Sequence, residues 1–271
     1  MRGMLKLLVS SLLVASVGCG ASDEPPKPLG SHYDDMYIAG VPLDQKQSMI
    51  QTQQDWNVAR MQNANAGTQE QEAESQLHQA HNDVKAAQLG VDSAASNKKL
   101  ADQSADMNRI NAATKDLNTA RDLQKAAEAR VHYLESYVRY LRRYERWTQE
   151  NMYFREAQFE NSKAQIGQKN NIAPKGVVYA SFGTQMDDRK HRTESAKSNY
   201  EHLLDDAKKS RDGWIKIQTS ADAENGHPGT YWDPLAVKQA GPPPSAPPPA
   251  LPPAPAGTPP APEAAPAPAS E

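Results

Sequence analysis

Residues 131–154 read VHYLESYVRYLRRYERWTQENMYF, and two apolar stripes run through them at helical spacing. The aliphatic stripe is Val131, Leu134, Val138 and Leu141. The aromatic stripe is Tyr133, Tyr137, Tyr140, Tyr144, Trp147 and Phe154, with Asn151 filling the gap. Steps of three and four residues place each set on one side of an α-helix. A helix with two apolar stripes has to contact two neighbours, or one neighbour and a ligand.

The aliphatic stripe belongs to a longer heptad seam, and a second seam lies upstream. The first runs through Ile110, Ala113, Leu117, Ala120, Gln124, Ala127, Val131, Leu134, Val138, Leu141, Glu145, Thr148, Met152, Arg155 and Phe159. The second runs through Trp56, Ala59, Asn63, Ala66, Glu70, Ala73, Leu77, Ala80, Val84, Ala87, Val91 and Ala94. This spacing is typical of helices that pack along a narrow stripe. Alanine permits close approach but buries little area, so the upstream helix needs its partner to persist.

The two seams do not share a phase. Twelve residues separate the seam position at Lys98 from Ile110, which is neither a multiple of seven nor a slip of three or four. Polar, turn-tolerant residues lie between them. The simplest interpretation is an antiparallel hairpin over residues 43–168, with arms about 80 Å long at 1.5 Å per residue. One very long kinked helix is the competing interpretation.

A third helix is predicted over residues 186–222. Its inward positions are Ala196, Tyr200, Leu203, Ala207, Trp214 and Ile217, with Ser210 as the polar exception. We expect it to pack near the 131–160 end of the hairpin, with residues 169–185 as a connector across the bundle end. The predicted fold class is therefore all-α: a long antiparallel coiled-coil hairpin with a third packed helix and a disordered Pro/Ala-rich C-terminal tail.

The first eighteen residues are typical of an export signal. Arg2 and Lys6 precede a short apolar run at residues 7–15. A run of this length suits a signal peptide and is too short to cross a bilayer as a permanent helix. We therefore expect residues 1–18 to be a signal peptide, and no later stretch reaches the apolar length that a membrane span needs.

Residues 16–20, Ser-Val-Gly-Cys-Gly, resemble the lipobox of bacterial lipoproteins. Val17 and Gly18 match that pattern, and Ser16 replaces its usual leucine. The resemblance implies cleavage before Cys19, a lipid on its sulfur and acylation of the new N-terminus. Cys19 is the only cysteine, so it can form no intrachain disulfide, and lipidation would consume a thiol that is a liability in an oxidising compartment. Cleavage after Ala21, without a lipid, is the alternative.

The residue after the cysteine bears on location. In enteric bacteria an aspartate there resembles an inner-membrane retention signal, and this chain has Gly20 instead. That favours a lipid-anchored protein of the cell envelope, in the outer membrane and facing the periplasm, with the cell surface as the other option.

Proline-rich segments flank the predicted helices. Residues 19–42 contain Pro25, Pro26 and Pro28 and predict an extended linker that lifts the helices off the bilayer. Residues 241–271 hold 14 Pro and 9 Ala. We expect residues 223–271 to form a disordered tail that leans towards polyproline conformation.

Motifs of catalysis or cofactor binding are absent from the sequence. There is no P-loop, GxGxxG, HExxH or GxSxG pattern. Glu74, His78 and His81 share a helix face at a spacing that can ligate a metal. Polar residues also belong on the solvated flank of any coiled coil, which is the favoured interpretation. We therefore expect no metal, no other cofactor and no enzyme activity.

Four arginines, Arg139, Arg142, Arg143 and Arg146, alternate with the tyrosines of residues 131–154. Nucleic acid is excluded as a partner, because export denies access to it and because removal of residues 1–18 leaves 28 basic and 33 acidic side chains, a net charge of −5. We expect the arginines to stack on tyrosines inside the bundle. Acidic glycan or peptidoglycan is the less favoured ligand.

These features favour a structural spacer or scaffold of the cell envelope, held to the membrane through lipid on Cys19. The alternative is a binding module whose aromatic stripe at residues 133–154 receives an envelope partner, either a transport complex or peptidoglycan. The coiled coil also permits self-association. An enzyme is disfavoured, because a narrow alanine seam offers no groove in which the pKa of a carboxyl would rise.

Overall fold

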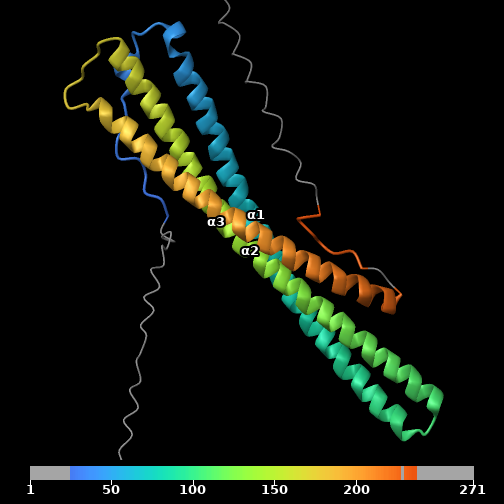
Figure 1. The fold of residues 1–271 in the computed structure, drawn as a ribbon. Coiled ribbons are helices and arrows are strands. Elements are labelled where there is room, and N and C mark those ends of the chain that lie inside the picture. The colour runs from blue at the N-terminus through green and yellow to red at the C-terminus, as the bar shows by residue number, and fades with distance from the viewer. Residues whose placement is uncertain (1–24, 227–228, 237–271) are drawn as a thin grey trace, which may run out of the picture. The chain divides into compact units, whose positions relative to one another are not determined.

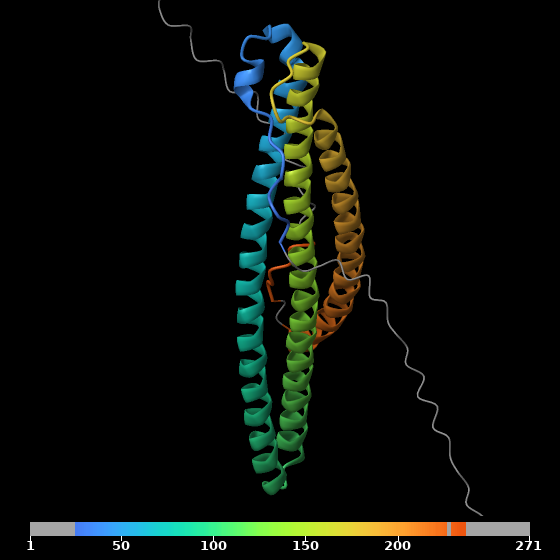
Figure 2. The same ribbon diagram turned by 90° about the vertical axis from the view of Figure 1, so that its left-hand side faces the viewer.

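The computed structural model describes residues 25–226 and 229–236. Three long helices, α1 (Gln47–Gln103), α2 (Met107–Lys169) and α3 (Tyr179–Asn225), follow two short 3₁₀ turns, η1 (Asp35–Ile38) and η2 (Leu43–Lys46) (Figure 1). α2 packs against both other helices and lies between them (Figure 2). Because α1 and α3 both run antiparallel to α2, the predicted all-α hairpin with a third packed helix is confirmed.

The chain divides into two compact units, and the first of them ends at Trp232. The helical bundle and its contacts lie in this first unit. The predicted signal peptide, Cys19 and most of the predicted C-terminal tail lie outside the described residues. In the part of the chain that the structure describes, no helix combines the length and the apolar character needed to cross a bilayer.

A tight turn joins α1 to α2. Ala105 adopts a left-handed backbone conformation with a φ of 56°. Asp106 then caps α2, since its carboxylate accepts hydrogen bonds from the amides of Asn108 at 2.9 Å and Arg109 at 3.4 Å. The chain therefore reverses here, and the alternative of one long kinked helix is wrong.

The α1–α2 interface follows the two predicted seams. Every seam residue from Trp56 to Ala94 and from Ile110 to Phe159 is buried or half-buried. Ala59, Ala66, Ala73 and Ala80, spaced by seven, are almost completely buried. Asn63, a polar position of the seam, accepts a hydrogen bond of 3.0 Å from the hydroxyl of Thr148 on α2. The polar interruptions of the two seams therefore meet each other instead of apolar surface.

α3 begins earlier than predicted. It starts at Tyr179, so residues 179–185 of the predicted connector are helical, and only residues 170–178 connect α2 to α3. Phe182 explains the difference, because it is buried in an apolar cluster at this end of the bundle. α3 therefore begins ahead of Phe182, so that this side chain lies on a helical turn and reaches the cluster.

The inward face of α3 departs from the predicted heptad at its end. Ala207 and Trp214 are buried as expected, but Ile217 is 40% exposed and Gln218 is 7% exposed. An α-helix with 3.6 residues per turn drifts relative to a heptad, and over this length the drift moves the inward position by one residue. The placement of Ile217 in the core was therefore wrong.

The segment predicted as an extended linker packs on the bundle instead. Tyr33, Ile38 and Val41 join Phe182 and Ile166 in the apolar cluster where α2 ends and α3 begins. Three prolines lie close together at residues 25–28, but the apolar side chains that follow them are buried on the bundle. The described part of this segment, residues 25–42, is thus part of the folded body.

Polar contacts fix the same segment along α3 and α2. The amides of Gly30 and Ser31 donate to the side-chain oxygen of Gln185 at 3.0 and 2.9 Å, and the Gln185 amide donates back to the Ser31 carbonyl at 3.0 Å. The amide of Tyr33 donates to the buried carboxylate of Glu160 at 2.6 Å. Side-chain amide and carboxylate groups of the helices therefore replace the sheet partners that an extended strand would otherwise need.

Candidate functional site

The aromatic stripe, which the alternative interpretation assigned to an envelope partner, is covered by α3. Tyr133 is fully buried, and its ring stacks on Trp214 with centroids 5.3 Å apart. Tyr140 is also buried, which raises the pKa of its hydroxyl. Tyr200 of α3 lies edge-on to Tyr144 with centroids 5.4 Å apart. These rings form the α2–α3 core.

The chain after α3 covers more of the stripe. Trp232 lies edge-on to the buried Tyr137, with ring centroids 6.1 Å apart. Tyr231 contacts Trp214 at 6.1 Å, and the guanidinium of Arg130 lies 5.5 Å from its ring centre. The remaining residues of the stripe, Tyr144, Trp147 and Phe154, are half-buried. The expected packing of a third helix on this stripe is therefore confirmed, and the alternative of an open aromatic surface is wrong for Tyr133, Tyr137 and Tyr140, because α3 and residues 231–232 occupy the place of a partner.

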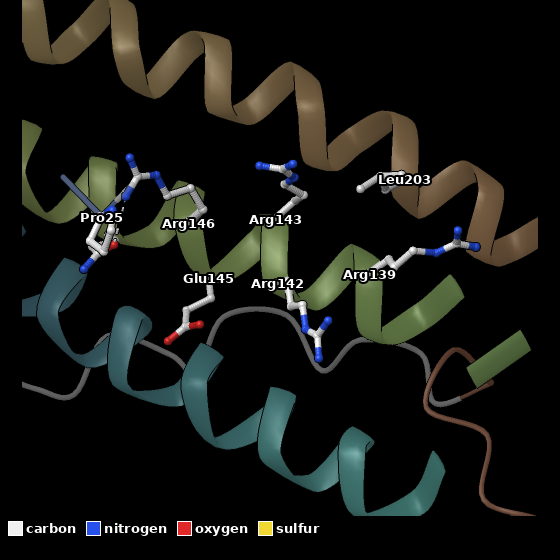
Figure 3. A pocket seen from close by; sticks show the side chains of 8 residues that line it. Pro25, Arg139, Arg142, Arg143, Glu145, Arg146 and Leu203 are labelled. Atoms are coloured by element: carbon white, nitrogen blue, oxygen red, sulfur yellow. Dashed lines mark hydrogen bonds between the residues drawn. The ribbon is translucent and has the colours of Figure 1, made fainter. Parts of the chain in front are cut away.

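The accessible side of the same helix segment is basic. Two adjoining grooves with volumes of about 710 and 460 Å³ share Arg143 and Arg146, and Figure 3 shows the first of them. The first is lined by Pro25, Arg139, Arg142, Arg143, Glu145, Arg146, Gln149 and Leu203. The second is lined by Arg143, Arg146, Glu150, Asp188, His191, Arg192, Ser195, Ala196 and Asn199. We call the two together the arginine groove.

The arginines of this groove are held by different partners. Arg142 reaches towards α1 and binds Glu74 at 2.6 Å and Glu70 at 3.2 Å. Arg146 lies 3.4 Å from Glu150, one turn further along α2. Arg139, which is exposed, donates to the hydroxyl of Ser136 at 3.0 Å. The groove is thus lined by side chains that α2 supplies at successive turns.

Stacking of these arginines on tyrosines was expected, and the cation–π contacts lie elsewhere. Among the described residues the contacts are made by Arg60, Arg130, Arg155, Lys163 and Arg189. The reason is the direction in which the side chains leave α2. The tyrosines point into α3, whereas the arginines occupy the neighbouring positions of α2, which border the groove.

The charges that line the groove are mainly positive. Five arginines stand against three carboxylates. Glu145 is directed towards α1 and away from Arg143 (Figure 3). Glu150 is buried and lies 3.4 Å from both Arg146 and Arg189, so a further cation compensates it. The arrangement can attract an anion with several oxygens.

The sequence pattern indicated four of the five groove arginines but missed Arg192, and it also missed Arg189, which compensates Glu150. Both lie on α3, 43 or more residues from the cluster on α2. Nothing in the spacing along the chain signals that α3 returns beside Arg143. The groove can be recognised only when the alignment of α3 along α2 is known. The aromatic contacts between the two helices set that alignment.

A second cluster lies inside the α1–α2 seam. Burial raises the pKa of Glu70 to about 7, and a shared hydrogen bond with Glu145 and the charge of that group add to the effect, although Arg142 opposes it. The oxygen of Glu145 lies so near Gly67 that an added Cβ there would be only 3.2 Å away. The expectation that the alanine seam cannot raise the pKa of a carboxyl was therefore wrong.

The candidate metal ligands do not come together. Glu74 is bound to Arg142, and His78 and His81 are exposed on α1. Within residues 25–226 and 229–236 no three His, Cys, Asp or Glu side chains are grouped so as to hold a metal ion.

Comparison of the chain with protein-family models, with curated proteins and with solved structures gives no match. Its function is therefore inferred from the residues and their geometry.

Proposed function

We propose that this chain is a lipid-anchored protein of the cell envelope that acts as a structural spacer or scaffold through its helical bundle. The observation that carries the proposal is the seating of residues 25–42 on the bundle. A lipid on Cys19 would be six residues from Pro25, so it would be joined almost directly to a stiff body.

The bundle is suited to hold a distance. α2 has 63 residues and is about 95 Å long at 1.5 Å per residue. Ion pairs reinforce the alanine contacts along it, such as Arg130 with Asp83 at 2.9 Å and Arg142 with Glu74 at 2.6 Å. A long helix that neighbours support over most of its length resists bending, which is what a spacer requires.

The junction with the anchor is also stiff. Tyr33 is 1% exposed, and its ring lies against Gly167 of α2. Lys163, a buried cation on the same helix, binds Glu160 at 2.8 Å and Asp35 at 2.9 Å. A force on the lipid would thus be transmitted to α2 and not absorbed by a loose linker.

The proposed location of the protein rests on the residue that follows Cys19. Gly20 favours the outer membrane, with the bundle in the periplasm, and we include this placement in the proposal.

Palmitate incorporation and membrane fractionation of wild type and Cys19→Ala test the anchor. We expect the wild type to take up the lipid and to stay in the membrane fraction after a salt wash. The Cys19→Ala protein should incorporate no palmitate and remain in the membrane fraction only at low salt. A wild-type protein without palmitate would refute the anchor.

A second candidate is a binding module that uses the distal arm of the hairpin. α1 and α2 extend past the end of α3, which lies beside Asp122. Leu100 and Met107 near the turn are exposed, as is Leu89. An envelope protein is the partner class that such apolar side chains fit.

Photo-crosslinking in intact cells distinguishes the two candidates. The crosslinker replaces Leu100 in one variant and Val178, which is exposed at the opposite end of the bundle, in the matched control. A discrete adduct from position 100 and none from position 178 supports the binding module. Adducts from neither position favour a spacer that touches its neighbours elsewhere.

A further inference from the structure

The described chain begins beside the middle of the bundle and not at one of its ends. Pro25 lines the arginine groove together with Arg143 and Arg146 (Figure 3). Downstream of it the backbone is held, since the carbonyl of Lys27 accepts a hydrogen bond from Arg189. The exit point of the N-terminal segment is therefore fixed relative to α2.

Chain length limits how far a lipid on Cys19 can lie from this point. Six residues separate Cys19 from Pro25, and they span at most roughly 20 Å when fully extended. From Arg146 the helix continues for about 35 Å to Lys169 and about 59 Å in the other direction to Met107, at 1.5 Å per residue. Neither end of α2 is within reach of the lipid.

An upright bundle is incompatible with these lengths. If its axis stood perpendicular to the bilayer, one end of α2 would enter the membrane by roughly 15 Å or more. Charged helix ends cannot be placed there at low cost. The bundle axis therefore has to lie within roughly 35° of the membrane plane. The side of the bundle from which the chain emerges then faces the lipid.

That side carries the arginine groove. We propose that the arginine groove is a docking surface for anionic phospholipid headgroups of the membrane that holds the lipid anchor. The inference rests on the proposed anchor, which sets the distance between Pro25 and the bilayer. Phosphate oxygens match the guanidinium groups of Arg139 and Arg143, whereas Arg192 already lies 3.4 Å from Asp188. A basic surface close to an anionic leaflet is attracted within about one Debye length.

This arrangement sharpens the spacer function. A bundle with its α2–α3 end at the membrane and its axis inclined would hold the tip of the hairpin no more than roughly 60 Å above the surface. The bound headgroups fix the inclination, since the lipid alone leaves the bundle free to pivot about Pro25.

Vesicle binding by the mature chain with Cys19→Ala, which carries no lipid, tests the docking surface. The probes are vesicles of zwitterionic phospholipid alone and of equal parts zwitterionic and anionic phospholipid. Arg139→Ala with Arg143→Ala removes two charges from the groove. Lys99→Ala with Lys115→Ala is the matched control, because both lysines are exposed on the distal arm and their loss changes the net charge equally.

We expect the lipid-free parent to bind only the anionic vesicles and to be released at high salt. Each basic side chain near an anionic surface contributes about a fivefold factor in partitioning, so the arginine pair should weaken binding by about tenfold to thirtyfold. The lysine pair should bind like the parent. Unfolding midpoints of both variants, measured alongside, show that the bundle is intact.

Equal binding of the arginine pair and the parent would overturn the proposal, as would equal losses for both pairs. Binding of the parent to isolated peptidoglycan but not to anionic vesicles would also overturn it. Failure of the proposed anchor gives a different result from failure of the docking surface. The wild-type protein would then carry no palmitate, whether or not the lipid-free chain binds vesicles.

Discussion

The covered half of the hairpin and its distal arm use the same heptad rule with different side chains. In the covered half, α2 presents Leu134 and Leu141 to α1 and a row of tyrosines to α3. In the distal arm, beyond the end of α3, α1 contributes mainly alanine and valine to a two-helix contact. Large side chains bury far more area per turn, so stability is concentrated where three helices meet.

The difference separates two tasks within one hairpin. The covered half also receives residues 25–42, so it holds the point at which the proposed lipid anchor would join the bundle. The arm adds length with little apolar burial and keeps exposed Leu100 and Met107 near its turn. Stiffness and the proposed anchoring therefore belong to the covered half, and the distal arm supplies the length.

Matched leucine truncations provide the strongest test of this comparison. Leu134 in the covered half is 0% exposed and Leu117 in the arm is 6% exposed. We expect Leu134→Ala to lower the free energy of unfolding by about 3–4 kcal/mol and Leu117→Ala by about 2 kcal/mol. Urea denaturation measures both. The arm can relax around the smaller cavity, because it packs on one side only.

Amide hydrogen exchange sharpens the same test. Leu117→Ala should accelerate exchange in the arm alone, since that region opens locally, whereas Leu134→Ala should accelerate exchange throughout α2 and α3. Uniform acceleration by both variants would show that the arm and the covered half form one cooperative unit.

A methyl group on Gly167 tests how residues 25–42 are held. An added Cβ would lie 1.9 Å from the hydroxyl oxygen of Tyr33, so the ring has to leave its place. We expect Gly167→Ala to cost about 2 kcal/mol, the range for an overpacked core, and to expose residues 25–42 to limited proteolysis.

Gly183→Ala is the control for that substitution. Gly183 is also helical, and nothing lies within 4 Å of its added Cβ, so alanine there should stabilise α3 by up to about 1 kcal/mol through helix propensity. Protection of residues 25–42 that is equal in the two variants would contradict the packing of Tyr33 against α2.

The sequence predicted the hairpin well because apolar residues, mostly alanine and leucine, recur at heptad spacing from Ala59 to Ala94 and again from Ile110 to Leu141. A seam of that length leaves one helix face for a partner, and the phase change near Lys98 marks the turn. The aromatic stripe likewise predicted a third helix. Local pattern therefore decided the fold wherever it was long and periodic.

Other features depended on tertiary contacts. Residues 25–42 have no period, and their burial requires the pocket that Phe182 and Gly167 create at the far end of the bundle. The arginine groove requires the register of α3 on α2. The shift from Ile217 to Gln218 comes from helix geometry that a strict heptad omits. Each miss involves groups brought together from distant parts of the chain.

Protonation of Glu70 should make the stability of the covered half depend on pH. Its pKa is about 7 in the folded protein, above its usual value of 4.5, because it is buried beside Glu145. Its contribution to stability is therefore fully present below about pH 4.5 and is lost as the pH rises through 7. We expect Glu70→Gln to raise stability at pH 8 relative to wild type by on the order of 1–2 kcal/mol, after allowance for solvent screening.

Unfolding curves from pH 5 to pH 8 measure this effect. Wild type should lose stability across the range, and Glu70→Gln should lose less. Glu72→Gln, on the exposed side of α1, is the control and should follow wild type. Parallel curves for wild type and Glu70→Gln would place the titrating group elsewhere.

Substitution at the turn between α1 and α2 is expected to change stability least. Ala105 has a φ of 56°, a conformation that glycine adopts at little cost and alanine does not. We expect Ala105→Gly to stabilise the arm by up to about 1 kcal/mol. Ala95→Gly, at an exposed position inside α1, should instead destabilise it by about 1 kcal/mol. Hydrogen exchange near the turn resolves both. Stability changes of opposite sign in the two variants would show that the turn is strained and that the strain lies in the arm. A loss of stability in both variants would mean that the left-handed conformation of Ala105 is tolerated and that glycine there does not stabilise the arm.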